Sequence, residues 1–175
     1  MSAEEYLDRG LEKNKLEDYS GAIDDFNKVI ELDSNDASAY FNRGRAKSFI
    51  DDDYGAISDY NKAIEINPDF AIVVYNNRGY SKLMLEDYKG AIEDYTKAIE
   101  RGPGYASAYY FRGIAKRNLE DYSGAIDDFT KTIEKNPNYP NVYYFRGGSK
   151  QHLGDYSGAI DDYTKAIELD PNDAN

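Results

Sequence analysis

The sequence predicts an all-α solenoid made of five tandem helix pairs. The first observation is the motif G-A-I-x-D-[FY]-x-K, which occurs five times with its glycines 34 or 35 residues apart: Gly21, Gly55, Gly90, Gly124 and Gly158. The second is an Arg-Gly pair with the same period, whose arginines are Arg9, Arg43, Arg78, Arg112 and Arg146. Self-similarity at a period of this size is typical of solenoids, in which each repeat packs mainly on its neighbours.

The first half of each repeat, which carries the Arg-Gly pair, is predicted to be a helix despite its glycine. In the fourth repeat Tyr110 and Ile114 stand four residues apart and so fall on one side of such a helix. A glycine inside a helix costs roughly 1 kcal/mol relative to alanine. Because this glycine returns in all five repeats, we expect a neighbouring helix to approach closely there.

The second half, which carries the G-A-I motif, is predicted to be an amphipathic helix. In the third repeat its apolar residues recur with the spacing of one helical face: Ala91, Ile92, Tyr95, Ala98 and Ile99. Asp87 precedes this segment, where a carboxylate caps a helix, and Pro103 follows it, where proline ends one. The turn between the halves, L-E-D-Y-S-G or a close variant, has room only for an antiparallel pair.

Acidic residues on these second helices stand four positions before a lysine. This order favours ion pairs along a helix surface, each worth about 0.2–0.5 kcal/mol. We therefore expect such pairs between Asp24 and Lys28, Asp127 and Lys131, and Asp161 and Lys165.

On these residues the chain resembles the tetratricopeptide repeat (TPR) family, whose pattern is W-x2-L-G-x2-Y, then A-x3-F, then P. In the second repeat Tyr40, Gly44, Ala56, Tyr60 and Pro68 match that pattern. Arginine and lysine replace its Leu and its second aromatic residue in every repeat, as at Arg43 and Lys47. The resemblance covers almost the whole chain.

The resemblance implies one right-handed superhelical solenoid domain over residues 1–175, with repeats at about 3–36, 37–71, 72–105, 106–139 and 140–173. It also implies that the first helices line a concave surface. The expected function is that of a protein–protein interaction scaffold, which binds a peptide or a helix of a partner protein in that groove.

Composition and charge exclude several classes of function. The formal net charge of −12 argues against binding to nucleic acid or to an anionic membrane, because both need a basic surface. Cysteine is absent, so there is no disulfide framework and no thiolate metal site. No apolar run approaches the about 18 residues of a membrane span, and the first residues do not form a signal peptide. A cytoplasmic location is expected.

No catalytic constellation is visible in the sequence. His152 is the only histidine, and it is expected to be exposed and unengaged. The acidic run at Asp33 lacks the glycine and the glutamate that a calcium loop requires, because Ser38 and Gly44 occupy those places. The glycines follow the repeat period and form no phosphate loop. The chain is therefore predicted to be no enzyme and to need no cofactor or metal.

Three charged positions recur in every repeat: an arginine and a lysine four apart on the first helix, and an aspartate on the second. The sets are Arg9, Lys13 and Asp25; Arg43, Lys47 and Asp59; Arg78, Lys82 and Asp94; Arg112, Lys116 and Asp128; Arg146, Lys150 and Asp162. A feature common to all repeats favours a structural polar ladder between helices. A repeated charged binding stripe is the alternative.

The residues that vary between repeats on the first helices are the candidates for partner binding. By the resemblance they line the groove, with asparagines in its middle and aromatic rings toward its C-terminal end. Asparagine amides can bind a peptide backbone, and rings can seat apolar side chains. The alternative is that some of the rings only pack adjacent helices together. The set is Phe41, Asn42, Arg45, Asn76, Asn77, Tyr80, Tyr110, Phe111, Ile114, Tyr144 and Phe145.

The two ends of the repeat array suggest a second function, as a self-associating structural module. The last second helix is expected to expose an apolar strip of Ala159, Tyr163, Ala166 and Ile167. At the other end Tyr6, Leu7 and Leu11 lack an upstream neighbour. Because every internal junction joins one such face to the other, the two ends are expected to be complementary. Molecules are therefore expected to stack head to tail at high concentration without closing a ring.

Overall fold

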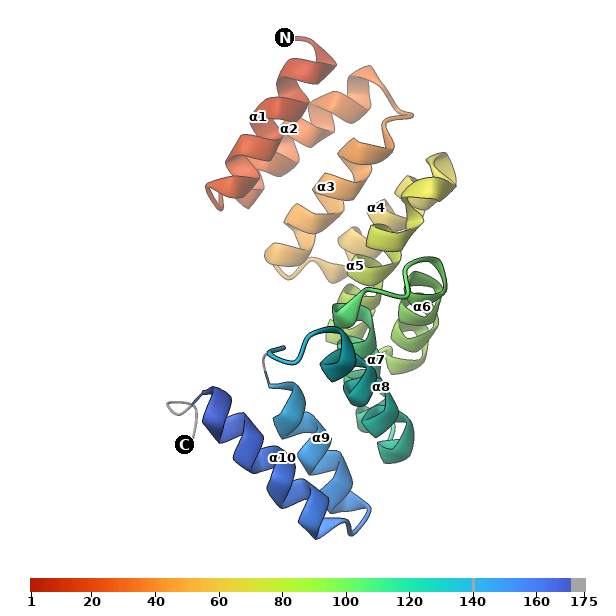
Figure 1. The fold of residues 1–175 in the computed structure, drawn as a ribbon. Helices are drawn as coiled ribbons and strands as arrows, with labels where there is room; N and C mark the ends of the chain where they lie inside the picture. The colour runs from red at the N-terminus through yellow and green to blue at the C-terminus, as the bar shows by residue number, and fades with distance from the viewer. Residues whose placement is uncertain (140, 171–175) are drawn as a thin grey trace. The chain divides into compact units, whose positions relative to one another are not determined.

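The computed structural model describes residues 1–139 and 141–170, and every regular element in this part of the chain is a helix (Figure 1). It contains ten α-helices and one short 3₁₀ helix, η1. Their bounds are α1 Ala3–Lys15, α2 Tyr19–Leu32, α3 Ala37–Phe49, α4 Asp53–Ile66, η1 Pro68–Phe70, α5 Ala71–Met84, α6 Tyr88–Arg101, α7 Ala106–Asn118, α8 Tyr122–Lys135, α9 Val142–His152 and α10 Tyr156–Leu169. The all-α fold built from helix pairs is confirmed.

The helices fall into two compact units, residues 1–87 and 88–175. In the first unit α1 pairs with α2 and α3 with α4, and α5 packs on α4. In the second unit α6 packs on α7, α7 pairs with α8, and α9 pairs with α10. The single-domain organisation over residues 1–175 stays a prediction of the repeat pattern.

The second helices begin where an aspartate caps them. Asp18, Asp52, Asp121 and Asp155 each accept a hydrogen bond from the backbone N–H of the motif glycine three residues later, at 2.9–3.0 Å. A Cβ atom on these glycines would lie 2.2–2.3 Å from the capping carboxylate. The glycine of the G-A-I motif therefore makes room for the cap, and capping at this place in the repeat is confirmed.

The glycine inside four of the first helices, α1, α3, α7 and α9, receives an aromatic ring from the second helix of its own repeat. A Cβ on Gly10 would lie 2.7 Å from the ring of Phe26, and one on Gly113 would lie 2.8 Å from the ring of Phe129. Both rings are fully buried. The predicted close approach of a neighbouring helix is thus confirmed, and it outweighs the low helix propensity of glycine.

The predicted surface ion pairs are wrong. Each lysine instead donates to a glutamate three residues later: Lys28 to Glu31, Lys62 to Glu65, Lys131 to Glu134 and Lys165 to Glu168, at 2.7–3.0 Å. An aspartate has one methylene group fewer than a glutamate, so it spans a helical turn less easily. Exposed pairs of this kind contribute about 0–1 kcal/mol at most.

Candidate functional site

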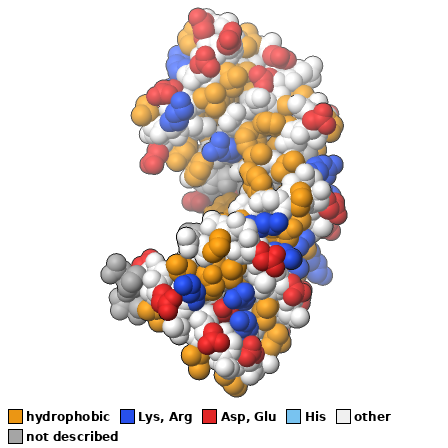
Figure 2. All heavy atoms as spheres, in the orientation of Figure 1, with side chains coloured by type: hydrophobic (Ala, Val, Ile, Leu, Met, Phe, Trp, Pro, Cys, Tyr) orange, Lys and Arg blue, Asp and Glu red, His pale blue; other side chains and the backbone are white. Residues whose placement is uncertain are grey.

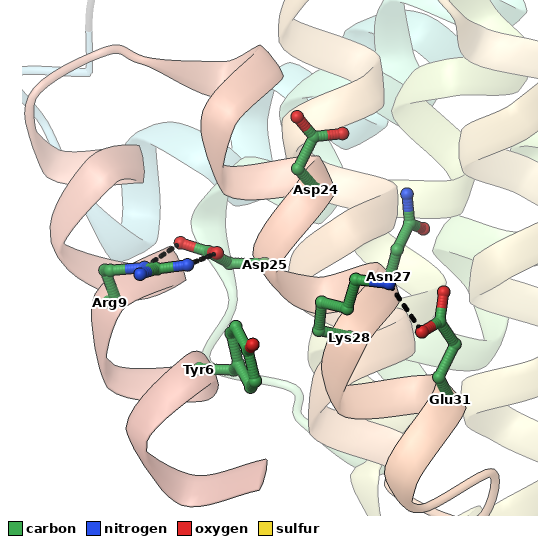
Figure 3. A pocket seen from close by; sticks show the side chains of 7 residues that line it. All are labelled: Tyr6, Arg9, Asp24, Asp25, Asn27, Lys28 and Glu31. Atoms are coloured by element: carbon green, nitrogen blue, oxygen red, sulfur yellow. Dashed lines mark hydrogen bonds and ion pairs between the residues drawn. The ribbon is translucent and has the colours of Figure 1, made fainter. Parts of the chain in front are cut away.

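In the first, second, fourth and fifth repeats, the recurring arginine, lysine and aspartate form an ion-pair cluster around the buried carboxylate. In the second repeat Arg43 donates to both oxygens of Asp59, from Nε at 2.9 Å and from Nη2 at 2.6 Å, and Lys47 adds a contact of 2.8 Å. Asp59 is 3% exposed. The same cluster occurs around Asp128 and Asp162 and, with a shorter Arg9 contact, around Asp25 (Figure 3).

The recurring arginine of the second to fifth repeats also reaches the preceding repeat. Its Nη1 group donates to a side-chain oxygen on that repeat's second helix. The bonds are Arg43 to Asn27 at 2.7 Å, Arg78 to Asn61 at 2.5 Å, Arg112 to Thr96 at 3.0 Å and Arg146 to Thr130 at 3.1 Å. One guanidinium thus ties three helices together. The clusters therefore form the structural ladder between helices, and their donors are not available as a binding stripe.

At Asp25 and Asp162 the ladder stabilises the charged carboxylate. At Asp25 the hydrogen bond from Arg9 is the largest influence, and together with Lys13 it lowers the pKa below its ordinary value. At Asp162 burial alone would raise the pKa, but hydrogen bonds from Arg146 and Lys150 lower it on balance.

In the first unit, the variable first-helix residues offer amides beside an exposed ring. Asn42 and Asn77 each donate to a carbonyl one turn earlier in their own helix, at 2.8 Å. The Oδ1 atom of Asn76 is buried and has no hydrogen-bond partner within the described residues. Tyr80 is 38% exposed, and Arg45 is exposed with its guanidinium over the ring of Phe41.

In the second unit, the corresponding surface is aromatic. Phe111, Ile114 and Phe145 are half-buried, and all three pack against the core cluster of this unit. Tyr144 is 57% exposed and lies edge-on to Phe145.

Two of the predicted binding residues belong to the core instead. Phe41 is 7% exposed and meets the ring of Phe70 edge-on at 5.0 Å. Tyr110 is 8% exposed and lies 4.7 Å from the ring of Tyr139, and burial raises its pKa to about 12. Both rings leave almost no surface for a ligand, so at these two positions the packing alternative holds.

Sequence reasoning did not select Arg117 on α7. Its guanidinium lies over the ring of Phe145, and its Nε atom is buried with no hydrogen-bond partner in the described part of the chain. The signal was present, because the corresponding positions hold Asn14, Ser48, Leu83 and Gln151 in the other repeats. The other candidates were chosen because they vary between repeats on the first helices, and the position of Arg117 varies in the same way.

The outer face of α10 is apolar but differs from the predicted strip. Ala159 is 3% exposed, so its assignment to the exposed strip is wrong: it faces the first helix of its own repeat. Tyr163 and Ala166 are half-buried, and Ile167 is 52% exposed. Ile160, which was not selected, is 64% exposed. It is one residue past Ala159 and therefore about 100° further round the helix.

The face of α1 does not match that strip. In the later repeats, the two first-helix positions that face the preceding repeat are filled by fully buried small residues: Ala39 and Ala46, Val74 and Ser81, Ala108 and Ala115, Val142 and Ser149. In α1 the same positions hold Glu5 and Glu12, both exposed. The expectation that the two ends are complementary is therefore not met.

A pocket of about 400 Å³ lies between α1 and α2 (Figure 3). Four of its five charged groups are already paired, Arg9 with Asp25 and Lys28 with Glu31, and the fifth, Asp24, is exposed to solvent. The lining residues are Tyr6, Arg9, Asp24, Asp25, Asn27, Lys28 and Glu31. Since both of its cations are satisfied within the pocket, we assign the pocket no ligand.

His152 is exposed but is not unengaged, which corrects the prediction. Its ring stacks on Tyr122 with centroids 4.4 Å apart and planes 4° from parallel. Tyr19 and Phe49 make the same stack in the first unit. Within the described residues, no group of three or more acidic or histidine side chains is arranged to hold a metal ion. No described helix is both long enough and apolar enough to cross a membrane.

Comparison with known families matches the repeat pattern directly. Models described as tetratricopeptide repeat match residues 37–70, 72–105 and 140–173, and one described as TPR repeat matches residues 10–47. Together they cover more than half of the chain. The chain belongs to the tetratricopeptide repeat family. Three of these spans begin where predicted repeats begin, at residues 37, 72 and 140, whereas the fourth, 10–47, runs across the first and second repeats.

Solved structures share the fold of this TPR protein. A crystal structure of MamA is 26% identical with a TM-score of 0.88, and the match covers 98% of this chain and 93% of that one. A MamA fragment from Desulfovibrio magneticus RS-1 is 20% identical with a TM-score of 0.91, covering 99% and 97%. YrrB, described as a TPR protein with an unusual peptide-binding site, is 21% identical with a TM-score of 0.80, covering 96% and 86%. A search of curated proteins found no match.

Proposed function

We propose that this TPR protein is an interaction scaffold that binds a peptide or a helix of a partner protein along its first helices. The observation that carries the proposal is that the first-helix residues fall into two groups with different roles. Those that recur in every repeat are used by the fold, as the Arg43 and Arg112 clusters show, whereas most of the variable ones keep accessible surface. Variable accessible residues can distinguish one partner from another.

Each unit offers a different kind of contact. In the first unit, the half-buried Asn77 offers an amide and Tyr80 offers an exposed ring on the same helix, α5, whereas the Oδ1 atom of Asn76 beside them is buried. In the second unit, Phe111, Ile114, Tyr144 and Phe145 supply ring and aliphatic surface for an apolar anchor, since aromatic pockets dominate binding energy at interfaces. Asn42 and Arg45 add polar contacts. That YrrB is described with a peptide-binding site supports such a site on this fold.

The charge of the chain limits the partner. A net charge of −12 favours neutral or basic segments and disfavours nucleic acid and anionic membranes. On the face drawn in Figure 2, acidic, basic and hydrophobic side chains are interspersed in each unit. We therefore expect side-chain contacts of the first helices to provide specificity, with long-range charge aiding association. We propose no catalytic role, and the cytoplasmic location stays a prediction.

A displayed library of random peptides tests this function. Peptides are selected on the wild-type protein and then titrated into the variants Tyr80→Ala and Tyr144→Ala. A peptide that contacts one of these rings should bind the corresponding variant about tenfold more weakly, a loss of about 1.4 kcal/mol. Tyr54→Ala is the control, because Tyr54 is 77% exposed on a second helix. Selected peptides that bind the Tyr80→Ala and Tyr144→Ala variants as tightly as the wild type would place the binding surface elsewhere.

Self-association by head-to-tail stacking was the alternative function. It would bring Glu5 and Glu12 of one molecule against Ile160 and Ile167 of the next. Burying a carboxylate against an apolar surface without a partner is strongly unfavourable. We therefore favour the peptide scaffold over the self-assembling module.

A further inference from the structure

At the internal junctions, the outer face of each second helix packs against the first helix of the next repeat. These junctions show which features such a first helix needs. At each described junction, the next first helix brings two small residues that are fully buried, such as Ala39 and Ala46 in α3. They are seven residues apart and so lie on one face. Between them stands the arginine whose Nη1 bonds to the second helix, as Arg43 does to Asn27 at 2.7 Å.

The outer face of α10 has the same residues that the earlier second helices use to contact the next first helix. Ile160 and Ile167 are 64% and 52% exposed, whereas the same two isoleucines are half-buried in all earlier repeats. Ile64 and Ile133, for example, pack against clusters that contain a valine of the next first helix. Thr164 is exposed at the position where Thr96 and Thr130 accept from an arginine.

The α1 helix cannot occupy this face because three of its residues are acidic. Glu5 and Glu12 replace the two small residues, and Asp8 stands where the later repeats have Asn42, Asn77, Phe111 and Phe145. All three acids are exposed. The Glu5 carboxylate accepts a hydrogen bond from the backbone N–H of Ser2 and closes a capping box, so it also fixes the start of α1.

We propose that the outer face of α10 is a docking site for a helix of the internal first-helix type supplied by another chain. Such a helix has a central arginine and small residues four positions before it (alanine or valine) and three positions after it (alanine or serine). The same geometry assigns Glu5, Asp8 and Glu12 as the groups that keep a second copy of this chain from filling the site. This surface is distinct from the variable residues of the first helices, so its test is independent of the peptide scaffold.

The first experiment converts α1 into a helix of the internal type. The variant Glu5→Ala, Asp8→Asn, Glu12→Ala gives α1 the residues that repeat two has at these positions, Ala39, Asn42 and Ala46. Light scattering across a concentration series should show constant monomer mass for the wild type and growing mass for the variant. Adding Ile160→Gln and Ile167→Gln to the variant should restore the monomer. These glutamines leave the charge unchanged.

A control variant separates the loss of charge from the shape of the face. Asp24→Asn, Glu93→Ala and Asp127→Asn remove three exposed acids of second helices and should leave the protein monomeric. A monomeric α1 variant with a wild-type helical spectrum would overturn the proposal. Growth that survives the two glutamines would overturn it as well, as would wild-type association through Ile160.

The second experiment needs no change in α1. A peptide with the α7 sequence, residues 106–118, is held helical by a lactam bridge and titrated into the wild-type protein and the Ile160→Gln, Ile167→Gln variant. The wild type should bind it about tenfold more tightly than the variant. A bridged peptide with the α1 sequence, residues 3–15, should not bind. Equal binding of the α7 peptide to both proteins, or none to either, would refute the docking site.

Discussion

Arg112 on α7 and Asp128 on α8 meet in a two-pronged ion pair, with Nε and Nη2 of the arginine 2.9 and 2.7 Å from the two carboxylate oxygens. Lys116 lies 2.8 Å from the same carboxylate, and Nη1 of Arg112 bonds to Thr96 on α6. The pair therefore joins the two helices of one repeat to the repeat before it. Its members recur because every junction in the stack needs the same connection.

Removing the carboxylate of Asp128 should destabilise the protein strongly. The variant Asp128→Asn leaves Arg112 and Lys116, which are 16% and 21% exposed, without their counter-charge. Breaking a buried pair in this way costs about 3 kcal/mol or more. The neighbouring Asp127 is exposed, so Asp127→Asn should change the free energy of unfolding by less than about 0.5 kcal/mol. Urea titrations of both variants measure the difference, and similar midpoints would contradict the ladder.

Acid should weaken the fold through the same carboxylates. The pKa values of Asp25 and Asp162 are lowered in the folded protein, so the folded state binds protons less readily than the unfolded chain. Their contribution is complete above the ordinary aspartate pKa of about 3.9 and is lost as the pH falls through the lower folded values. Unfolding free energies measured from pH 6 downward should decrease below about pH 4. Asp162→Asn should flatten part of that decrease, and an unchanged slope would exclude Asp162 as a source.

The helix glycines allow a test of packing against propensity within first helices. Gly113→Ala would place a Cβ 2.8 Å from the buried ring of Phe129, which should cost about 1–3 kcal/mol despite the better helix propensity of alanine. At Gly148 the nearest atom to a new Cβ, the Tyr163 hydroxyl oxygen, is 3.5 Å away. Gly148→Ala should therefore stabilise the protein by about 0.5–1 kcal/mol. Thermal unfolding of both variants gives the signs, and a stabilising Gly113→Ala would show that the ring can move aside.

The capping aspartates should each contribute measurably. Asp121 accepts the N–H of Gly124 at 2.9 Å, and Asp121→Ala should cost about 0.5–2 kcal/mol. Asp121→Asn preserves an acceptor at this position and should cost much less. Chemical unfolding of the two variants separates the hydrogen bond from the rest of the side chain. If alanine and asparagine behave alike, the cap hydrogen bond is not the source of the stability.

Features that repeat along the chain were predictable from the sequence. The helix pairs, the close approach at Gly10 and Gly113 and the caps at Asp18 and Asp121 depend on residues that are local or recur at a fixed period. The direction of the lysine pairs was not predictable in this way. It depends on side-chain reach, and Lys131 finds Glu134 rather than Asp127.

The candidate binding surface was predictable only in part. Its residues were chosen because they vary between repeats, and most keep some accessible surface in the structure. Arg117 was missed although it varies in the same way. The choice could not separate rings that point to solvent from rings that pack, since both occur at the same repeat position.

Phe41, Tyr110 and Tyr144 show which property the sequence alone does not determine, namely the burial of a side chain. They occupy one position of the repeat, and the periodicity by itself determined that all three lie on first helices. Only the tertiary structure decided that Phe41 and Tyr110 are buried and that Tyr144 is 57% exposed. The rings of Phe70 and Tyr139 cover the first two, whereas the residue at the corresponding place after Tyr144 is Asp173, which carries no ring and lies outside the described residues. Helix formation depends on neighbours along the chain, but burial depends on what a different helix or turn places against a side chain.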